Sequence, residues 1–541
     1  MAQDVNSSAF DDLKRMVEQQ QQQIRQLQAQ AANQQQPVAQ SQTGQIPAVP
    51  TGYGDPAPAA AVAATAAAAA GTGLPPGATI VSNDKSPLNV CWNNGLWYES
   101  ANKEFSLHLG GRMEWDAGTY EAPRSTVAEL RALNNSPTSP GNANGWQNFQ
   151  DNMDFRRARL RVDGTIYENI DFICEFEFAG SFAVVRPNRT GAGGTLNTGV
   201  ANSTIANSAN LIDAVTPTWV ECTLKDIPIL GNVMAGQFLV PFSFDLGTSD
   251  EYTQFIERSA AFDVFVPQSG TGNFAQGVEA FDWNEAETAT WRNSLTTNTE
   301  NDPFNGIALA NDAFSWIGRA TWLPYYDEAS GGRYLVHVGV DAQAQGLERD
   351  VINFHDRGDV HEPYAITPSY VNQNVVGTYS EMICPEFVAV WGPWCLESEY
   401  YAMEVNGSNI SGTAKGNFGH FFDGGYLQAS YFLTGENMTY VRRAAAFTRV
   451  TPYENFVNLP GERTHCGLGA WQVAARYSWV DLNDQGVHGG HLDESTLGLN
   501  WYLNPNMHYA FNYCYTRVVG LGAGGATESA NGFGFRMTMN F

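Results

Sequence analysis

The strongest constraint on the fold is a strict two-residue alternation at the end of the chain. Residues 533, 535, 537, 539 and 541 are Phe, Phe, Met, Met and Phe, and the residues between them are Gly, Arg, Thr and Asn. A period of two is the pattern of a β-strand with one apolar face. The same alternation covers 497–503 and 507–515, which are separated by the turn-forming sequence Asn504-Pro505-Asn506. The C-terminal region is therefore predicted to be a series of antiparallel strands.

The alternation extends back through the chain and predicts sixteen strands. They lie near 104–118, 153–165, 170–182, 217–225, 232–241, 274–283, 288–296, 313–324, 332–344, 384–392, 393–406, 420–434, 466–481, 490–504, 507–517 and 531–541. Most short connections follow even strands, and long connections, such as 119–152 and 183–216, follow odd strands. This sorting is typical of an outer-membrane barrel, and an even strand number places both chain ends in the periplasm. We therefore predict an all-β fold, a 16-stranded antiparallel transmembrane β-barrel.

The charged side chains indicate which face of the sheet is wet. Arg157, Arg159 and Arg161 share one face of their strand, and Glu175 and Glu177 share one face of the next. Three further arginines, Arg319, Arg476 and Arg536, also lie opposite an apolar face. A dry barrel interior would bury these charges at a high cost, and sixteen strands enclose too wide a space for side chains to fill. We therefore expect a water-filled lumen lined by charge, with the arginines at 157–161 paired to the neighbouring glutamates.

Composition and motifs exclude several function classes. The net charge of −27 leaves no basic surface for nucleic acid, and no apolar run approaches the roughly 18 residues of a membrane-spanning helix. The sequence shows no catalytic triad order, no CxxC pair and no HExxH motif. We therefore expect no enzymatic activity, no cofactor and no metal site. The expected hairpin geometry also argues against a disulfide between Cys384 and Cys395.

The N-terminal region has a different pattern. Phe10, Val17, Ile24 and Ala31 are spaced by seven residues, which predicts a short coiled coil over 8–32. A disordered Gln-rich leader is the alternative. Residues 33–80 are rich in Gln, Pro and Ala and form a predicted linker, and 81–541 form the predicted barrel.

Several stretches resemble the phosphate-selective porin O and P family. They are 155–160 (FRRARL), 236–242 (GQFLVPF), 255–259 (FIERS), 430–436 (SYFLTGE), 474–482 (AARYSWVDL) and 497–506 (LGLNWYLNPN). The resemblance covers about 105–541 and leaves out the coiled coil and the linker. It implies a trimer of sixteen-stranded barrels in the bacterial outer membrane.

The same resemblance implies that two external loops and one periplasmic segment fold into the lumen. The corresponding segments here are 242–273, 345–383 and 435–465. The resemblance then implies a constriction lined by basic residues, which here would be Arg258, Arg349, Arg357, Arg442, Arg443, Arg449 and Arg463. The first segment is acidic, however, and only Lys225 and Lys415 follow residue 103, both expected in connections.

We therefore expect a passive porin for small hydrophilic solutes or anions, with weak charge selectivity. Its expected partners are outer-membrane lipid, two further copies of the chain and, through the periplasmic N-terminal segment, peptidoglycan. An alternative is a structural outer-membrane protein that tethers the membrane to the cell wall through the coiled coil. A secreted, soluble β-rich binding domain is a second alternative.

Overall fold

A computed structural model describes most of the C-terminal part of the chain. The described residues are 88–123 except 94, 152–179, 188–190, 195–197, 215–266, 273–297, 314–347, 351–360 except 357, 371–407, 419–456, 467–521 and 526–541. The predicted coiled coil and linker lie outside these residues. No helix in the described part is long and apolar enough to cross a membrane.

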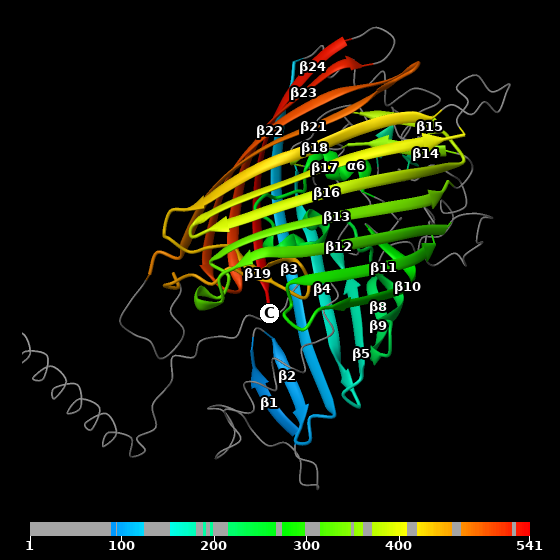
Figure 1. The fold of residues 1–541 in the computed structure, drawn as a ribbon. Coiled ribbons are helices and arrows are strands. Elements are labelled where there is room, and N and C mark those ends of the chain that lie inside the picture. The colour runs from blue at the N-terminus through cyan, green and yellow to red at the C-terminus, as the bar shows by residue number, and fades with distance from the viewer. Residues whose placement is uncertain are drawn as a thin grey trace, which may run out of the picture. The chain divides into compact units, whose positions relative to one another are not determined.

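Sixteen strands form a closed antiparallel barrel (Figure 1). They are β3 (Phe105–Glu121), β4 (Asn152–Ile166), β5 (Ile170–Glu177), β8 (Thr216–Ile227), β9 (Gly231–Leu239), β10 (Phe274–Trp283), β11 (Ala289–Thr297), β12 (Phe314–Tyr326), β13 (Tyr334–Gly346), β16 (Tyr379–Trp391), β17 (Trp394–Asn406), β18 (His420–Phe432), β21 (Ala470–Asp484), β22 (Val487–Asn504), β23 (Met507–Leu521) and β24 (Ala526–Asn540). Each strand pairs with its neighbours in sequence order, and β24 closes the barrel by pairing with β3. The predicted fold and strand number are confirmed.

The two faces of the wall differ as the alternation predicts. Along β16, Ile383 and Phe387 are exposed on the outside, whereas Cys384 and Glu386 are buried toward the inside. Large apolar side chains cover the outer face of most other strands in the same way, and polar or charged side chains alternate with them on the inner face. A wall with this pattern suits contact with lipid outside and polar groups inside.

The connections divide between the two ends of the barrel. The turns at 167–169, 228–230, 392–393 and 505–506 lie at one end, which we call the short-turn end. The long connections after β3, β5, β9, β11, β13 and β17 lie at the other, the long-loop end. Residues Phe105 and Phe541 both lie at the short-turn end, because β3 begins there and β24 ends there.

The strand pattern did not predict the hairpin that precedes the barrel. It consists of β1 (Leu88–Trp92) and β2 (Leu96–Ser100), and β2 pairs with β3 from Leu109 to Ser106. The pairing of β24 with β3 ends at Arg112, and Phe541 exchanges backbone hydrogen bonds with Gly111 of β3. Strand β2 therefore occupies the edge of β3 that β24 leaves free.

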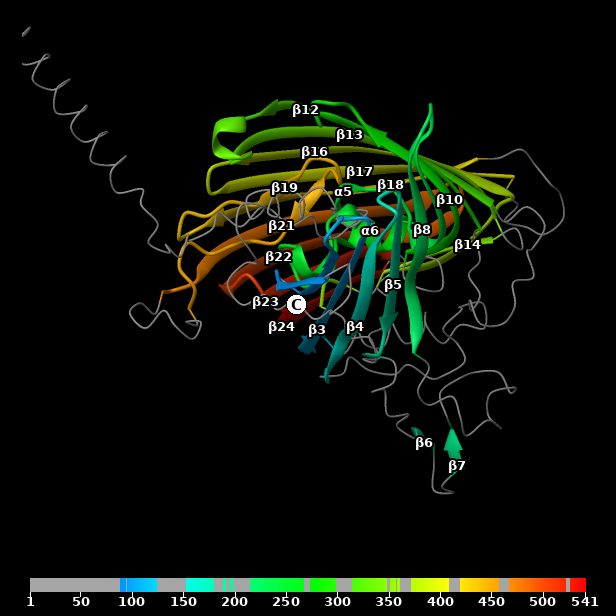
Figure 2. The ribbon, with the colours of Figure 1, turned by 90° about the horizontal axis from the view of Figure 1, so that it is seen from below.

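Three connections fold into the barrel, as the family resemblance implied (Figure 2). The first insert, 240–266, contains α5 (Phe244–Gly247), the 3-10 turn η2 (Asp250–Tyr252) and α6 (Ala260–Phe265). The second insert pairs β14 (Val351–His355) with β15 (Asn372–Val376) and includes 356 and 358–360. The third insert, 433–456, enters from the short-turn end and pairs β19 (Thr439–Val441) with β20 (Ala446–Thr448). A further small hairpin joins β6 (Asn188–Thr190) to β7 (Thr195–Asn197), and η3 (Glu328–Ser330) lies between β12 and β13.

Glycines on the inner wall allow these inserts to approach closely. A Cβ added at Gly424 of β18 would lie 2.7 Å from the ring of Phe265, and one at Gly534 of β24 would lie 2.9 Å from Ile256 and from Val360. Gly498 of β22 faces Phe255 in the same way. The absence of side chains at these positions leaves room for the apolar side chains of the first and second inserts.

Candidate functional site: the inner wall and the inserts

Asp250 of the first insert lies among three arginines. Arg157 Nε lies 2.9 Å from its carboxylate and Arg112 Nη2 lies 3.4 Å from it, while Arg258 pairs with its other oxygen. Burial alone would raise the pKa of Asp250, but Arg157, Arg258 and Arg112 hold that pKa well below its usual range. These contacts fasten η2 to the wall strands β3 and β4.

Arg536 of β24 makes a second attachment for the same insert. Its guanidinium donates to both oxygens of Asp116, at 2.7 and 2.6 Å, and to Glu257 Oε1 at 2.8 Å. It also donates to the backbone carbonyl of Ile256. Glu257 in turn accepts from Arg156 Nε at 2.8 Å, so two wall arginines share one carboxylate of the insert.

Arg156 reaches the insert because β4 is irregular. The register between β3 and β4 shifts between Glu114 and Trp115, which pair with Arg157 and Phe155. This β-bulge leaves Arg156 without a direct partner and lets two consecutive arginines reach groups of the first insert. Simple alternation predicts Arg157 on the inner face and Arg156 on the outer face, so sequence reasoning missed Arg156.

The rest of the arginine row on β4 pairs with wall carboxylates. Arg159 contacts Glu177 at 2.7 Å and Glu175 at 3.1 Å, which confirms the expected ladder at this position. Arg161 pairs instead with Asp163 of its own strand, at 2.9 Å. Arg157 donates to Glu114 of β3 at 2.7 Å, a carboxylate that the sequence analysis did not single out.

The second insert is attached through Asp359. The same carboxylate oxygen accepts hydrogen bonds from Arg476 of β21 and Thr496 of β22. Arg476 also donates to the backbone carbonyl of Glu257 at 2.9 Å, so one side chain connects the first and second inserts to the wall. The backbone N–H of Val360 donates to the hydroxyl of Tyr120, at the end of β3.

The third insert is attached through Arg319. This arginine of β12 contacts Glu386 at 3.0 Å and Asp341 at 3.4 Å, and it donates to the backbone carbonyl of Ala445. His337 bridges Glu386 and the hydroxyl of Tyr440, which belongs to β19. The inner wall and all three inserts are therefore joined by paired, mostly buried charges.

The arginines of the third insert lie nearer the barrel rim. Arg442 pairs with Glu328 at 2.7 Å and Arg443 with Glu287 at 2.7 Å, and both glutamates belong to connections at the short-turn end. Arg449 donates to the carbonyl of Pro505 at 2.8 Å and to the hydroxyl of Tyr252. Arg349, Arg357 and Arg463 lie outside the described residues.

Lys225 is placed differently from the expectation. It lies within β8 rather than in a connection, because that strand runs on to Ile227, and its ammonium pairs with Asp171 at 2.9 Å. Lys415 lies outside the described residues. The cysteines agree with the sequence analysis, since Cys384 and Cys395 are both free.

The pairing leaves an excess of carboxylates. Among the described residues, each inner-face arginine of the barrel strands has a carboxylate within 4.0 Å. In the same part of the chain, Glu221, Glu397 and Glu494 have no basic partner within that distance, although all three are buried on the inner face. On the inner face, carboxyl groups therefore outnumber the arginines that pair with them.

Comparisons with known proteins agree on a family. The model of the phosphate-selective porin O and P family matches residues 139–537. Porin O of Pseudomonas aeruginosa is 22% identical over 86% of this chain and 95% of its own length. An uncharacterized protein of Caulobacter vibrioides is 25% identical over 86% of this chain and 79% of its own length.

Solved barrels superpose loosely. OmpF of Salmonella typhi covers 84% of this chain and 100% of its own, with a TM-score of 0.43 and 12% identity. The family match spans most of the barrel, including β4, the first insert and the C-terminal strands. The chain belongs to the phosphate-selective porin O and P family and is a porin of the bacterial outer membrane.

Proposed function

We propose that the protein is a general diffusion pore with a weak preference for cations. The observation that carries this proposal is the pairing of every described inner-face wall arginine with a carboxylate, in a chain with 56 acidic residues against 29 lysines and arginines. A paired charge attracts permeating ions weakly because its field is largely cancelled at a distance. The net field in the lumen is then negative, and cations are favoured slightly over anions.

The proposed path runs along β4, β5 and β8, on the inner wall. The charged groups here that keep partial exposure include Arg159, Arg161, Glu177 and Lys225, whose side chains are 11, 23, 17 and 17% exposed. By contrast, an apolar cluster packs the first and second inserts against β17, β18, β21 and β22. Small hydrophilic solutes and ions would therefore pass beside the β4–β8 wall, with the inserts filling the opposite side.

The proposed pore-lining set keeps the residues that the sequence singled out. The path along the wall would be lined by Arg157, Arg159, Arg161, Glu175 and Glu177. The more deeply buried Arg258, Arg319, Arg476 and Arg536 would shape the path by holding the inserts in position. Arg442, Arg443 and Arg449 would act at the mouth, where Arg443 is 42% exposed and can meet solutes before they enter. The assembly would be a homotrimer in outer-membrane lipid, as the family resemblance implies.

The test is the reversal potential of the purified protein in a planar bilayer across a KCl gradient. Salt should stay at about 0.1 M or below, where the screening length is about 10 Å and wall charges still act on ions. We expect a small potential of the sign that marks cation preference. A potential of the anion-selective sign, or strong block by added phosphate, would overturn the proposed preference.

Two opposite variants sharpen this test. Glu177→Gln leaves Arg159 with one carboxylate fewer and should shift the potential toward anions, whereas Arg159→Gln should shift it toward cations. Glu404→Gln is the matched control, because Glu404 lies exposed on the outer face of β17 and away from the lumen. Equal shifts in all three variants would mean that these charges do not line the ion path.

A further inference from the structure

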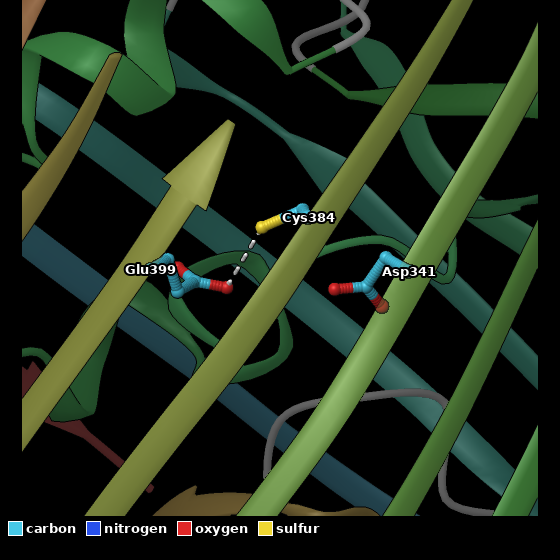
Figure 3. A group of neighbouring side chains, drawn as sticks. All are labelled: Asp341, Cys384 and Glu399. Carbon is cyan, nitrogen blue, oxygen red and sulfur yellow. Dashed lines mark hydrogen bonds between the residues drawn. The ribbon is translucent and has the colours of Figure 1, made fainter. Parts of the chain in front are cut away.

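Three donor side chains meet on the inner wall beside the first insert (Figure 3). They are Asp341 of β13, Cys384 of β16 and Glu399 of β17, and one ligand atom from each lies within 4.8 Å of the others. Asp341 and Cys384 are direct partners in the strand register, and Glu399 pairs with Glu386, two residues beyond Cys384. Strand pairing therefore holds the three donors together, independently of any loop.

Asp341 lacks the hydrogen bonds that its burial demands. Its side chain is 0% exposed, and neither carboxylate oxygen accepts a hydrogen bond of good geometry from the described residues, although the backbone of Ser243 lies nearby. Its cationic neighbour is Arg319, with Nε at 3.4 Å. Figure 3 shows the Asp341 carboxylate directed toward the other two donors. A buried carboxylate in this condition indicates a missing partner.

The local charge identifies that partner as a cation. Asp341, Glu386 and Glu399 place three carboxylates together, and Arg319 is the guanidinium that faces them, 3.0 Å from Glu386. Arg319 therefore divides its charge between two carboxylates and cannot balance all three when they are ionised. A divalent cation bound between Asp341, Cys384 and Glu399 would offset this excess.

The combination of one sulfur and two carboxylate donors favours some divalent cations over others. Sulfur is a poor ligand for magnesium and calcium but a strong one for zinc and cadmium, which also accept carboxylate oxygen. Zinc bond lengths of about 2.0–2.3 Å place neighbouring donors roughly 3.5 Å apart in a tetrahedral site. Cys384 Sγ already lies 3.8 Å from Glu399 Oε1, so a small rotation of Asp341 would complete three ligands.

We propose that Asp341, Cys384 and Glu399 form a binding site for a thiophilic divalent cation such as Zn²⁺ or Cd²⁺. The thiol proton leaves to solvent when the ion binds, and a water molecule supplies the remaining ligand. Glu399 also accepts the backbone N–H of Phe244 at 2.6 Å, at the start of α5. An ion at this site would therefore tie β13, β16 and β17 to the carboxylate that holds the first insert.

The experiment measures metal in the purified full-length protein. Cd²⁺ is supplied in two ways, during folding into detergent and to the already folded protein, and excess ion is removed by gel filtration. We expect a single tightly held Cd²⁺ per chain by mass spectrometry, together with ultraviolet absorption from cadmium–thiolate charge transfer. Zn²⁺ should compete with it, whereas Mg²⁺ should not.

Matched variants show whether these residues hold the ion. Cys384→Ser should abolish the charge-transfer absorption and weaken Cd²⁺ binding about tenfold or more. Asp341→Asn should weaken Cd²⁺ binding by a similar factor. Cys395→Ser is the control, because Cys395 is another buried, free cysteine on β17 and lies outside the donor group. Folding of each variant is checked by its heat-dependent gel mobility, and Asp341→Asn serves if Cys384→Ser fails to fold.

Two results would overturn the proposal. One is that the wild-type protein retains no Cd²⁺ by either route, which would mean that the Cys384 thiol only donates a hydrogen bond to Glu399. The other is equal retention by the wild type, Cys384→Ser and Asp341→Asn, which would place the ion elsewhere. Neither result bears on ion conduction, because the reversal potential is measured without added metal.

Discussion

Single buried charges in this barrel act through their partners. Arg536 is among the largest fully buried side chains, and its guanidinium satisfies Asp116 of β3 and Glu257 of the first insert together. The value of such a residue lies less in the energy of each pair than in preventing two carboxylates from being buried alone. Arg443 at the rim is the opposite case, since its side chain is exposed to water and gains less from its ion pair.

We expect Arg536→Met to lower the free energy of unfolding by about 3–5 kcal/mol, because it leaves Asp116 and Glu257 without this cation. Urea unfolding of the protein in detergent, followed by tryptophan fluorescence, measures the change. Arg443→Met is the control and should cost about 0–1 kcal/mol, because the Arg443 side chain is exposed to water and its pair with Glu287 is solvated. Equal costs for the two variants would contradict this account.

The attachment of Asp250 should resist acid. Its pKa in the folded protein is lowered, so the stability that it contributes is complete above its unfolded pKa of about 3.9 and is lost only as pH falls through the lower folded value. Conductance noise from movement of the first insert should therefore remain low at pH 4 and rise at still lower pH. Asp250→Asn should show that noise already at pH 7. Noise in the wild type at pH 7, with none in Asp250→Asn at that pH, would contradict the assigned contacts.

At the residue scale, sequence alternation identified the inner-face arginines but not their partners. It placed Arg157, Arg159 and Arg161 on one face correctly, because the pleat alone determines the face. It could not identify Glu257 as the partner of Arg536, because these residues meet only when the first insert folds back across the barrel. A bulge is also invisible to a fixed period of two, which explains why Arg156 was missed.

At the scale of elements, the inserts and the wall are shaped to each other. The glycines at 424, 498 and 534 interrupt the inner face where the inserts press against it. An isolated glycine in a strand pattern often marks a close approach of another segment. This signal was present in the sequence and would have shown where the inserted segments contact the wall.

We expect Gly534→Val to displace the inserts. The added Cβ would lie 2.9 Å from Ile256 and Val360, which would have to move. Single-channel recordings should show larger and noisier current steps, and a protease should cut the first or second insert faster. Thr538→Val is the control, because Thr538 is already β-branched and lies on the same face of β24. Unchanged currents in Gly534→Val would show that the inserts do not depend on this contact.

The elements themselves were predictable to different degrees. Strands with an apolar outer face are revealed by alternation, so the bounds of β10 were predicted correctly and those of β17 within one residue. By contrast, β24 begins at Ala526, five residues before its predicted start. Hairpin β1–β2 was missed because only four residue pairs join it to β3. It pairs there because β24 leaves the edge of β3 free before Arg112. A free edge is a property of strand lengths around the closed barrel, which no single segment reveals.

At the scale of the whole molecule, the barrel and the N-terminal region are expected to have separate roles. The residues that carry the proposed pore all lie beyond Ser106, whereas the predicted coiled coil and linker occupy 8–80. Purified protein lacking residues 1–80 should therefore conduct ions as the full chain does, in the same planar bilayer.

In cells, the same truncation tests whether the N-terminal region tethers the membrane to the cell wall or forms part of the pore. If that region tethers the membrane to the cell wall, the truncated protein should support normal solute uptake while periplasmic enzyme leaks into the medium. A full-length chain with Val17 and Ile24 changed to Asp is the control for the coiled coil. Loss of conductance on truncation would instead make the N-terminal region part of the pore.

The junction between hairpin and barrel has a mechanical consequence. A force that pulls Leu88 away from the barrel enters β3 through β2, whose pairing spans only Leu96–Glu99, whereas β24 grips β3 from Asn531 to Asn540. Under load the short pairing yields first, and the long one keeps the barrel shut. We therefore expect the hairpin to detach from β3 at a lower force than the one that separates β24 from β3.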